Sequence, residues 1–134
     1  MNYFGMSINK SSVLAECAGT DIENGAFLAV KYDGNGNIVL NDTEGAVIAG
    51  ILLPETTSDL KQGQDATIQI KDIGYAKAGA AVKKGAELMA DTQGRLITAT
   101  NGKFIVGFAV SNAEAVDEVI QVDIRKCGYK PAEA

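Results

Sequence analysis

Short hydrophobic runs, each bounded by Gly, Asn or Asp, fill most of this chain. Residues 67–71 and 119–124 alternate apolar with polar positions, which is typical of strands with one buried face. The remaining runs are rich in Val, Ile, Phe or Tyr and too short for ordinary helices. Single helical turns are predicted at 58–62 and 112–116. Strands are predicted at 26–32, 37–41, 46–53, 66–71, 74–77, 86–90, 95–99, 103–110 and 118–125.

The order of glycines and strands occurs twice along the chain. Residues 25–28 (GAFL) are echoed by 85–88 (GAEL), 33–39 by 91–97, and 45–50 by 102–107. Ile68-Gln69-Ile70 followed by Gly74-Tyr75 is echoed by Ile120-Gln121-Val122 followed by Gly128-Tyr129. A unit of about fifty residues cannot bury its apolar face alone, so the two copies should pack on each other.

This pattern predicts an all-β fold, a compact β-sandwich or barrel-like domain with minimal helix. The expected domain spans residues 13–130, with repeat one at about 22–77 and repeat two at about 82–130. Residues 1–12 are expected to form an N-terminal arm, and residues 131–134 a loose tail.

Composition and charge argue against several classes of protein. The 134 residues suit one domain, and the net charge of −5 comes with only two arginines, Arg95 and Arg125. Because binding to a phosphate backbone depends on clustered basic residues, we expect no nucleic-acid partner. No apolar run is long enough to cross a membrane and no signal peptide is visible, so we expect synthesis in the cytoplasm without secretion through a membrane. Cys17 and Cys127 are interpreted as reduced, partly buried thiols.

Candidate chemistry is sparse. Histidine is absent, which excludes Ser-His-Asp triads, Cys-His dyads and the usual zinc sites. No phosphate-binding loop motif occurs either. The carboxylates Glu114, Asp117 and Glu118 are interpreted as solvated surface, with a carboxylate-only hydrolase as the remaining enzymatic alternative. The sequence therefore predicts no enzyme, no cofactor and no metal site.

One segment resembles a calcium loop in part. Asp33, Asn35, Asn37 and Glu44 fit four ligand positions of the EF-hand pattern, but Ile38 stands where that pattern needs glycine. A hairpin turn explains the segment instead. Its Gly36, and Gly94 in the second copy, are expected at positive φ. The glycines that interrupt apolar strands, Gly50 and Gly107, indicate a bulge or a close approach of backbones.

The arm carries four apolar residues, Tyr3, Phe4, Met6 and Ile8. One interpretation is a frayed terminus. The other is an arm that becomes ordered on a partner, because four apolar side chains gain little from exposure to water.

Two stretches carry a resemblance to a known family. Residues 82–97 (VKKGAELMADTQGRLI) followed by 103–110 (KFIVGFAV) resemble the small proteins that decorate the heads of tailed phages. Residues 24–30 (NGAFLAV) and 63–70 (GQDATIQI) are similar to the same pattern. The resemblance covers roughly residues 13–126 and rests on the order of glycines and strands.

The resemblance implies a β-rich capsid cement protein, usually a homotrimer, on the exterior of an icosahedral shell. The implied partner is the major capsid protein, whose capsomers the cement protein would bridge. Tyr3, Phe4, Met6 and Ile8 are then candidates for capsid contact. The alternative is a generic β-module for adhesion or ligand binding on another assembly.

Overall fold

The chain folds into strands alone in the part that the structure describes. A computed structural model describes residues 8–54 and 59–132, and within these ranges it contains ten strands and no helix. The all-β class predicted from the sequence is confirmed. The strands are β1 (Val13–Cys17), β2 (Ala29–Tyr32), β3 (Ile38–Leu40), β4 (Gly50–Leu52), β5 (Asp65–Gln69), β6 (Asp72–Lys77), β7 (Glu87–Ala90), β8 (Leu96–Thr98), β9 (Phe104–Ala109) and β10 (Val119–Tyr129).

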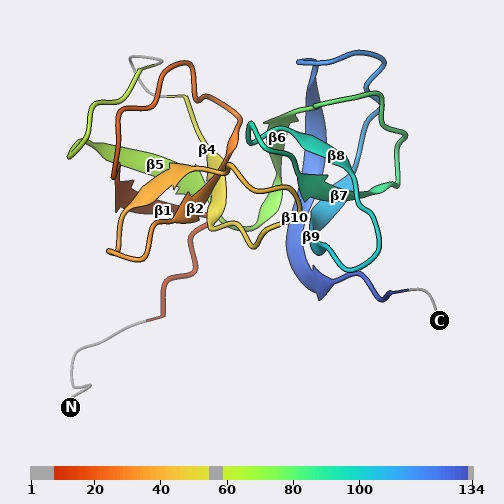
Figure 1. The fold of residues 1–134 in the computed structure, drawn as a ribbon, viewed down its shortest axis with the longest axis horizontal. Coiled ribbons are helices and arrows are strands. Elements are labelled where there is room, and N and C mark those ends of the chain that lie inside the picture. The colour runs from red at the N-terminus through yellow and green to blue at the C-terminus, as the bar shows by residue number, and fades with distance from the viewer. Residues whose placement is uncertain (1–7, 55–58, 133–134) are drawn as a thin grey trace.

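The strands form two antiparallel sheets of five, which lie side by side (Figure 1). Sheet 1 has the order β1-β5-β4-β2-β3, and sheet 2 has the order β6-β10-β9-β7-β8. In each sheet an isolated parallel bridge, Ala18 to Ile38 or Ala78 to Leu96, brings the last strand back to the first. Each sheet therefore curls towards a small barrel. We call residues 13–71 the N-terminal half and residues 72–130 the C-terminal half.

The two sheets have the same strand order, but they divide the chain at a different place from the predicted repeats. The sequence pattern groups residues 74–77 with the first set of strands, and this grouping is wrong. These residues belong to β6, which pairs with β10 in sheet 2. Gly74-Tyr75 lies in β6, whereas Gly128-Tyr129 forms the end of β10. The two pairs are similar in sequence but do not occupy equivalent positions in the structure.

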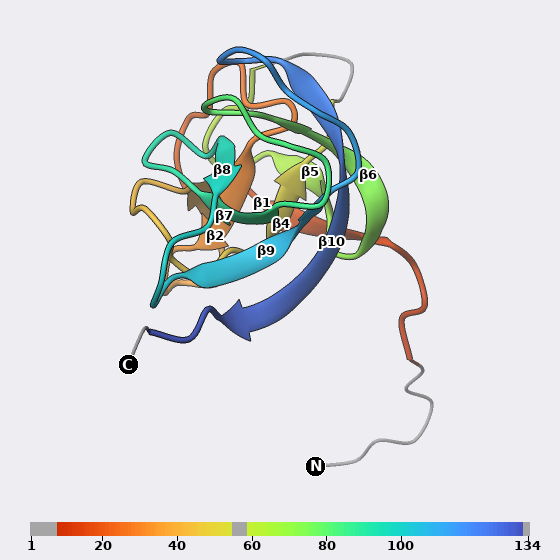
Figure 2. The ribbon, with the colours of Figure 1, turned by 90° about the vertical axis from the view of Figure 1, so that its right-hand side faces the viewer.

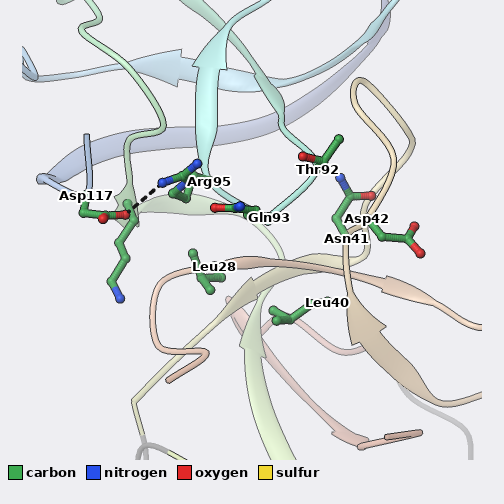
Figure 3. A pocket seen from close by; sticks show the side chains of 9 residues that line it. Leu28, Leu40, Asn41, Asp42, Thr92, Gln93, Arg95 and Asp117 are labelled. Carbon is green, nitrogen blue, oxygen red and sulfur yellow. Dashed lines mark hydrogen bonds and ion pairs between the residues drawn. The ribbon is translucent and has the colours of Figure 1, made fainter. Parts of the chain in front are cut away.

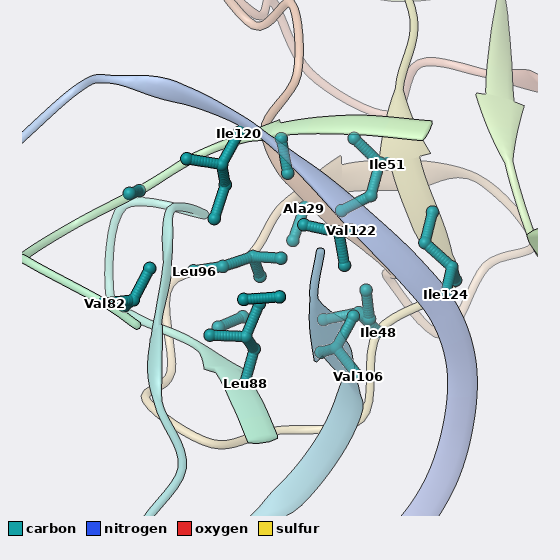
Figure 4. Close-up of a cluster of buried hydrophobic side chains, with 14 of the residues drawn as sticks. Ala29, Ile48, Ile51, Val82, Leu88, Leu96, Val106, Ile120, Val122 and Ile124 are labelled. Carbon is teal, nitrogen blue, oxygen red and sulfur yellow. The ribbon is translucent and has the colours of Figure 1, made fainter. Parts of the chain in front are cut away.

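A shared hydrophobic core joins the halves. The largest cluster of buried side chains comes mainly from the C-terminal half, with Ala29, Ile48 and Ile51 supplied by the N-terminal half (Figure 4). Burial of one aliphatic side chain stabilises a fold by about 1.5–3 kcal/mol. A second cluster, around Ile22 and Ile68, lies within the N-terminal half. The halves thus form one packed unit.

The two predicted helical turns are wrong where the structure describes them. Residues 59–62 and 112–116 are not helical. Leu60 instead forms a bridge with Ile22, and Ala113 forms one with Val82. Backbone pairing with a distant segment outweighs a local preference that spans only one turn.

Two glycines allow strands to approach closely, as predicted. A Cβ atom added to Gly50 would lie 2.4 Å from the carbonyl oxygen of Gln69, and one added to Gly107 would lie 2.0 Å from that of Asp123. Gly36 and Gly94 have positive φ, as expected of hairpin turns. The register of β10 against β9 shifts between Ile124 and Gly128, which marks a bulge.

Candidate functional site

An open cleft of about 430 Å³ lies where the two halves meet (Figure 3). Leu28 and Leu40 give it an apolar side, and Arg95 lies across from them. The other lining residues are Asn41, Asp42, Lys77, Thr92, Gln93 and Asp117. Because this cleft combines charged and apolar groups, the hydrogen bonds and ion pairs of its charged side chains indicate what role it can have.

Arg95 is held in place by two carboxylates. Its Nε donates to Asp91 Oδ2 and its Nη1 to Asp117 Oδ1, each at 3.3 Å. Asp91 also accepts hydrogen bonds through Oδ1 from the amides of Gln93 and Arg95, at 2.8 and 2.9 Å. The Asp91 carboxylate therefore fixes the hairpin turn between β7 and β8, and Arg95 neutralises it.

The side chain of Asn41 links the N-terminal half to the turn between β7 and β8. Its side chain is 1% exposed, and Nδ2 donates to the carbonyl oxygens of Thr43 and Asp91, both at 2.8 Å. Nearby, Lys31 Nζ donates to Asp42 Oδ1 at 2.5 Å. Hydrogen bonds from Lys31 and Thr43 lower the pKa of the exposed Asp42 carboxyl. Nδ2 of Asn41 thus links the two halves, whereas its buried Oδ1 has no hydrogen-bond partner among the described residues.

The carboxylates at the cleft are engaged in ion pairs. Arg95 pairs with Asp91 and Asp117, and Lys31 pairs with Asp42. Within residues 8–54 and 59–132 no group of three or more carboxylates or cysteines is placed to hold a metal ion. We interpret the cleft as a structural junction.

The segment that resembles a calcium loop forms a turn between β2 and β3, as predicted. Asp33 Oδ1 accepts hydrogen bonds from the amides of Asn35 and Asn37, at 2.7 and 3.2 Å. The same arrangement occurs at Asp91 in the second hairpin. In both hairpins the aspartate side chain therefore shapes the turn by accepting hydrogen bonds from the amides two and four residues later.

The acidic residues near the end of the chain do not form a separate site. Glu118 Oε2 accepts a hydrogen bond from the amide of Glu114 at 2.7 Å, and Asp117 pairs with Arg95. A second open cleft, of about 690 Å³, is lined by Lys83, Lys84 and Glu114 among others.

The candidate contact residues fall mostly outside the described ranges. Tyr3, Phe4 and Met6 lie there, and only Ile8 is described, with 83% of its surface exposed.

Cys17 and Cys127 are both free thiols. Cys17 is partly buried as expected, whereas Cys127, within the bulge of β10, is exposed. No described residue belongs to a helix that could span a membrane.

Comparison with known proteins identifies the family. The profile of a family described as phage cement protein matches residues 48–124, more than half of the chain. The chain belongs to the phage cement protein family. The resemblance noted in the sequence is thereby confirmed, and a structural role on the phage head follows from it. No curated protein sequence matches this cement protein.

A solved structure has the same fold. The base of the bacteriophage phi29 head fiber (gp8.5 N base) superimposes with a TM-score of 0.62 at 15% sequence identity. The match covers 91% of the cement protein and 98% of the phi29 chain. At this identity the similarity concerns the fold.

Proposed function

We propose that this cement protein decorates the exterior of an icosahedral phage capsid as a homotrimer and bridges neighbouring capsomers of the major capsid protein. The observation that carries the proposal is the family match over residues 48–124. The cleft between the halves supports a structural role, since Arg95 is paired there with both Asp91 and Asp117.

Charge supports an external position. The N-terminal half carries nine acidic and three basic residues, a net charge of −6, whereas the C-terminal half carries seven acidic and eight basic residues, a net charge of +1. An acidic half is repelled by packaged DNA, so it is best accommodated outside the shell. In this orientation the C-terminal half is the part that can approach the capsid without strong repulsion from an acidic shell.

The mechanism is stabilisation by binding. A protein that binds only the mature shell shifts the equilibrium away from ruptured or unexpanded shells. A trimer places three binding surfaces on one symmetric site, so contacts of modest affinity add up through multivalency. The arm supplies Tyr3, Phe4, Met6 and Ile8 as apolar anchors, and burial of each is worth about 1.5–3 kcal/mol before the cost of ordering the arm.

Heads of the parent phage that lack this protein provide the test. Labelled protein is added to the purified heads, which are then imaged by electron microscopy and heated until they release DNA. We expect density at three-fold positions outside the shell and release at a higher temperature. Failure of the protein to bind these heads would overturn the proposal and leave the adhesion module as the alternative.

A further inference from the structure

The outer surface of β6 and β10 exposes large apolar side chains. Ile73, Tyr75 and Val119 are 59%, 49% and 46% exposed. The antiparallel register pairs Ile73 with Asp123, Tyr75 with Gln121 and Lys77 with Val119. Residues paired in this way, and residues two apart on one strand, lie on the same face of a sheet. The three apolar side chains therefore share one surface, which we call the β6–β10 face.

The fold does not require large apolar residues at these positions, and sheet 1 supplies the internal comparison. There β1 and β5 pair in the same way, Val13 with Gln69, Ala15 with Thr67 and Cys17 with Asp65. Val13, Ala15 and Asp65 therefore correspond to Ile73, Tyr75 and Val119. These positions are also exposed, yet they hold smaller or charged side chains. Exposed apolar residues that packing does not explain indicate a contact surface.

On the β6–β10 face, the ring of Tyr75 is held in position, and the carboxylate of Asp123 is neutralised by an ion pair. Tyr75 packs edge-on against Phe27, with ring centroids 6.2 Å apart, so its ring is pre-positioned. Asp123 is paired with Arg125 at 2.7 Å. A rigid aromatic ring beside aliphatic side chains, with its nearest carboxylate neutralised, suits a protein partner with an apolar surface.

The N-terminal arm begins beside this face. The Ser12 hydroxyl donates a hydrogen bond to Asp72, the first residue of β6 and the neighbour of Ile73. From there residues 8–12 lead away on the side of the molecule where β6 and β10 lie (Figure 2). Residues 8–12 and the face therefore lie on the same side of the molecule, so a partner that binds the face lies within reach of residues 8–12.

We propose that the β6–β10 face docks on the surface of the major capsid protein, with Ile73, Tyr75 and Val119 as its apolar contacts. This inference rests on the proposed function and adds a docking surface on the folded body. The face belongs to the C-terminal half, whose charge is near neutral, and it continues the arm that leaves the body at Ser12.

The double variant Ile73→Ser/Tyr75→Ser tests the docking face on heads that lack the protein. We expect at least tenfold weaker retention than wild type. The matched control is Val47→Ser/Tyr32→Ser, because Val47 and Tyr32 are 50% and 49% exposed and lie outside β6 and β10. This control should be retained like wild type. The conservative variant Ile73→Val/Tyr75→Phe keeps the apolar surface and should also be retained.

Sedimentation and thermal unfolding of each free variant complete the test. We expect the same sedimentation and a melting temperature close to wild type, so that weak retention reports lost contacts. Wild-type retention by Ile73→Ser/Tyr75→Ser would overturn the inference while leaving the proposed function intact. A change in sedimentation of that variant alone would overturn it in favour of contact between copies of the chain. Failure of wild type itself to bind heads would instead overturn the proposed function.

Discussion

The amide of Ala29, at the start of β2, donates a hydrogen bond of 2.7 Å to the carbonyl oxygen of Gly94 in the turn between β7 and β8. This bond crosses from one half to the other. Gly94 has φ +79°, and a Cβ atom there would lie 2.9 Å from the carbonyl oxygen of Ala29. Glycine is thus required both by the backbone conformation and by the contact between halves.

Gly94→Ala should destabilise the protein more than the same change at Gly36. Gly36 occupies the corresponding place in the turn between β2 and β3 and has φ +87°, but a Cβ atom added there would meet no other atom within 4 Å. Both variants strain the backbone, by about 1–2 kcal/mol. Only Gly94→Ala also pushes the halves apart, which should cost about 1–3 kcal/mol more. Urea unfolding measures the difference, and equal losses would show that the junction tolerates the added methyl group.

Asp91→Ala should cost more stability than Asp33→Ala. Both aspartates accept two backbone amides in their hairpin turns, but Asp91 is buried and also pairs with Arg95. Hydrogen bonds to charged groups contribute about 1.5–3 kcal/mol, and buried donors left without an acceptor add a desolvation cost. Chemical denaturation of the two variants provides the comparison. A larger loss for Asp33→Ala would contradict the structural role assigned to the junction.

Lys126 should make stability depend on alkaline pH. Its Nζ donates to the carbonyl oxygen of Ala49 at 2.5 Å, and burial lowers the pKa of its ammonium group below the ordinary value of 10.5. Between the lowered pKa and 10.5 the unfolded chain binds more protons than the folded protein, so the free energy of unfolding rises with pH through that window. Below the window the burial penalty is present in full.

Unfolding measured from about pH 7 to about pH 10.5 should therefore show a more positive slope for wild type than for Lys126→Met. Lys71→Met serves as control, since Lys71 is exposed. Its slope should match that of wild type. Identical slopes for wild type and Lys126→Met would mean that Lys126 keeps an ordinary proton affinity in the folded state.

Much of the fold could be predicted because local pattern and final pairing agree. Nine of the ten strands lie at or near their expected positions, and the turn glycines have the expected conformations. The pattern does not predict β1 (Val13–Cys17), since an edge strand with a mixture of small and charged residues has no clear alternation. The end of β10 extends past residue 125 because Lys126, at φ +49°, and Gly128 form a bulge that lets pairing resume.

The junction and the β6–β10 face could not be predicted from the sequence. Asn41 is the last residue of the strand predicted at 37–41, and only the fold shows that its side chain is buried against Asp91. Ile73, Tyr75 and Val119 look like ordinary strand residues in the sequence. Only the pairing of β6 with β10 shows that these three side chains share one exposed surface.

Deletion of residues 2–8 should separate docking from folding. The described body begins its sheets at Val13, and Ile8 is 83% exposed, so the shortened protein should keep a melting temperature close to that of wild type. Its retention on heads that lack the protein should fall, because Tyr3, Phe4, Met6 and Ile8 no longer contribute apolar contacts, each worth about 1.5–3 kcal/mol when buried.

The matched control replaces the same four residues by serine, which keeps the length of the arm and removes its apolar side chains. If apolar contact drives docking, this variant should be retained as poorly as the deletion. If it is retained like wild type, the length or backbone of the arm matters and its side chains do not. Full retention of the deletion itself would assign docking to the folded body alone, with the β6–β10 face as the surface that remains for contact with the capsid.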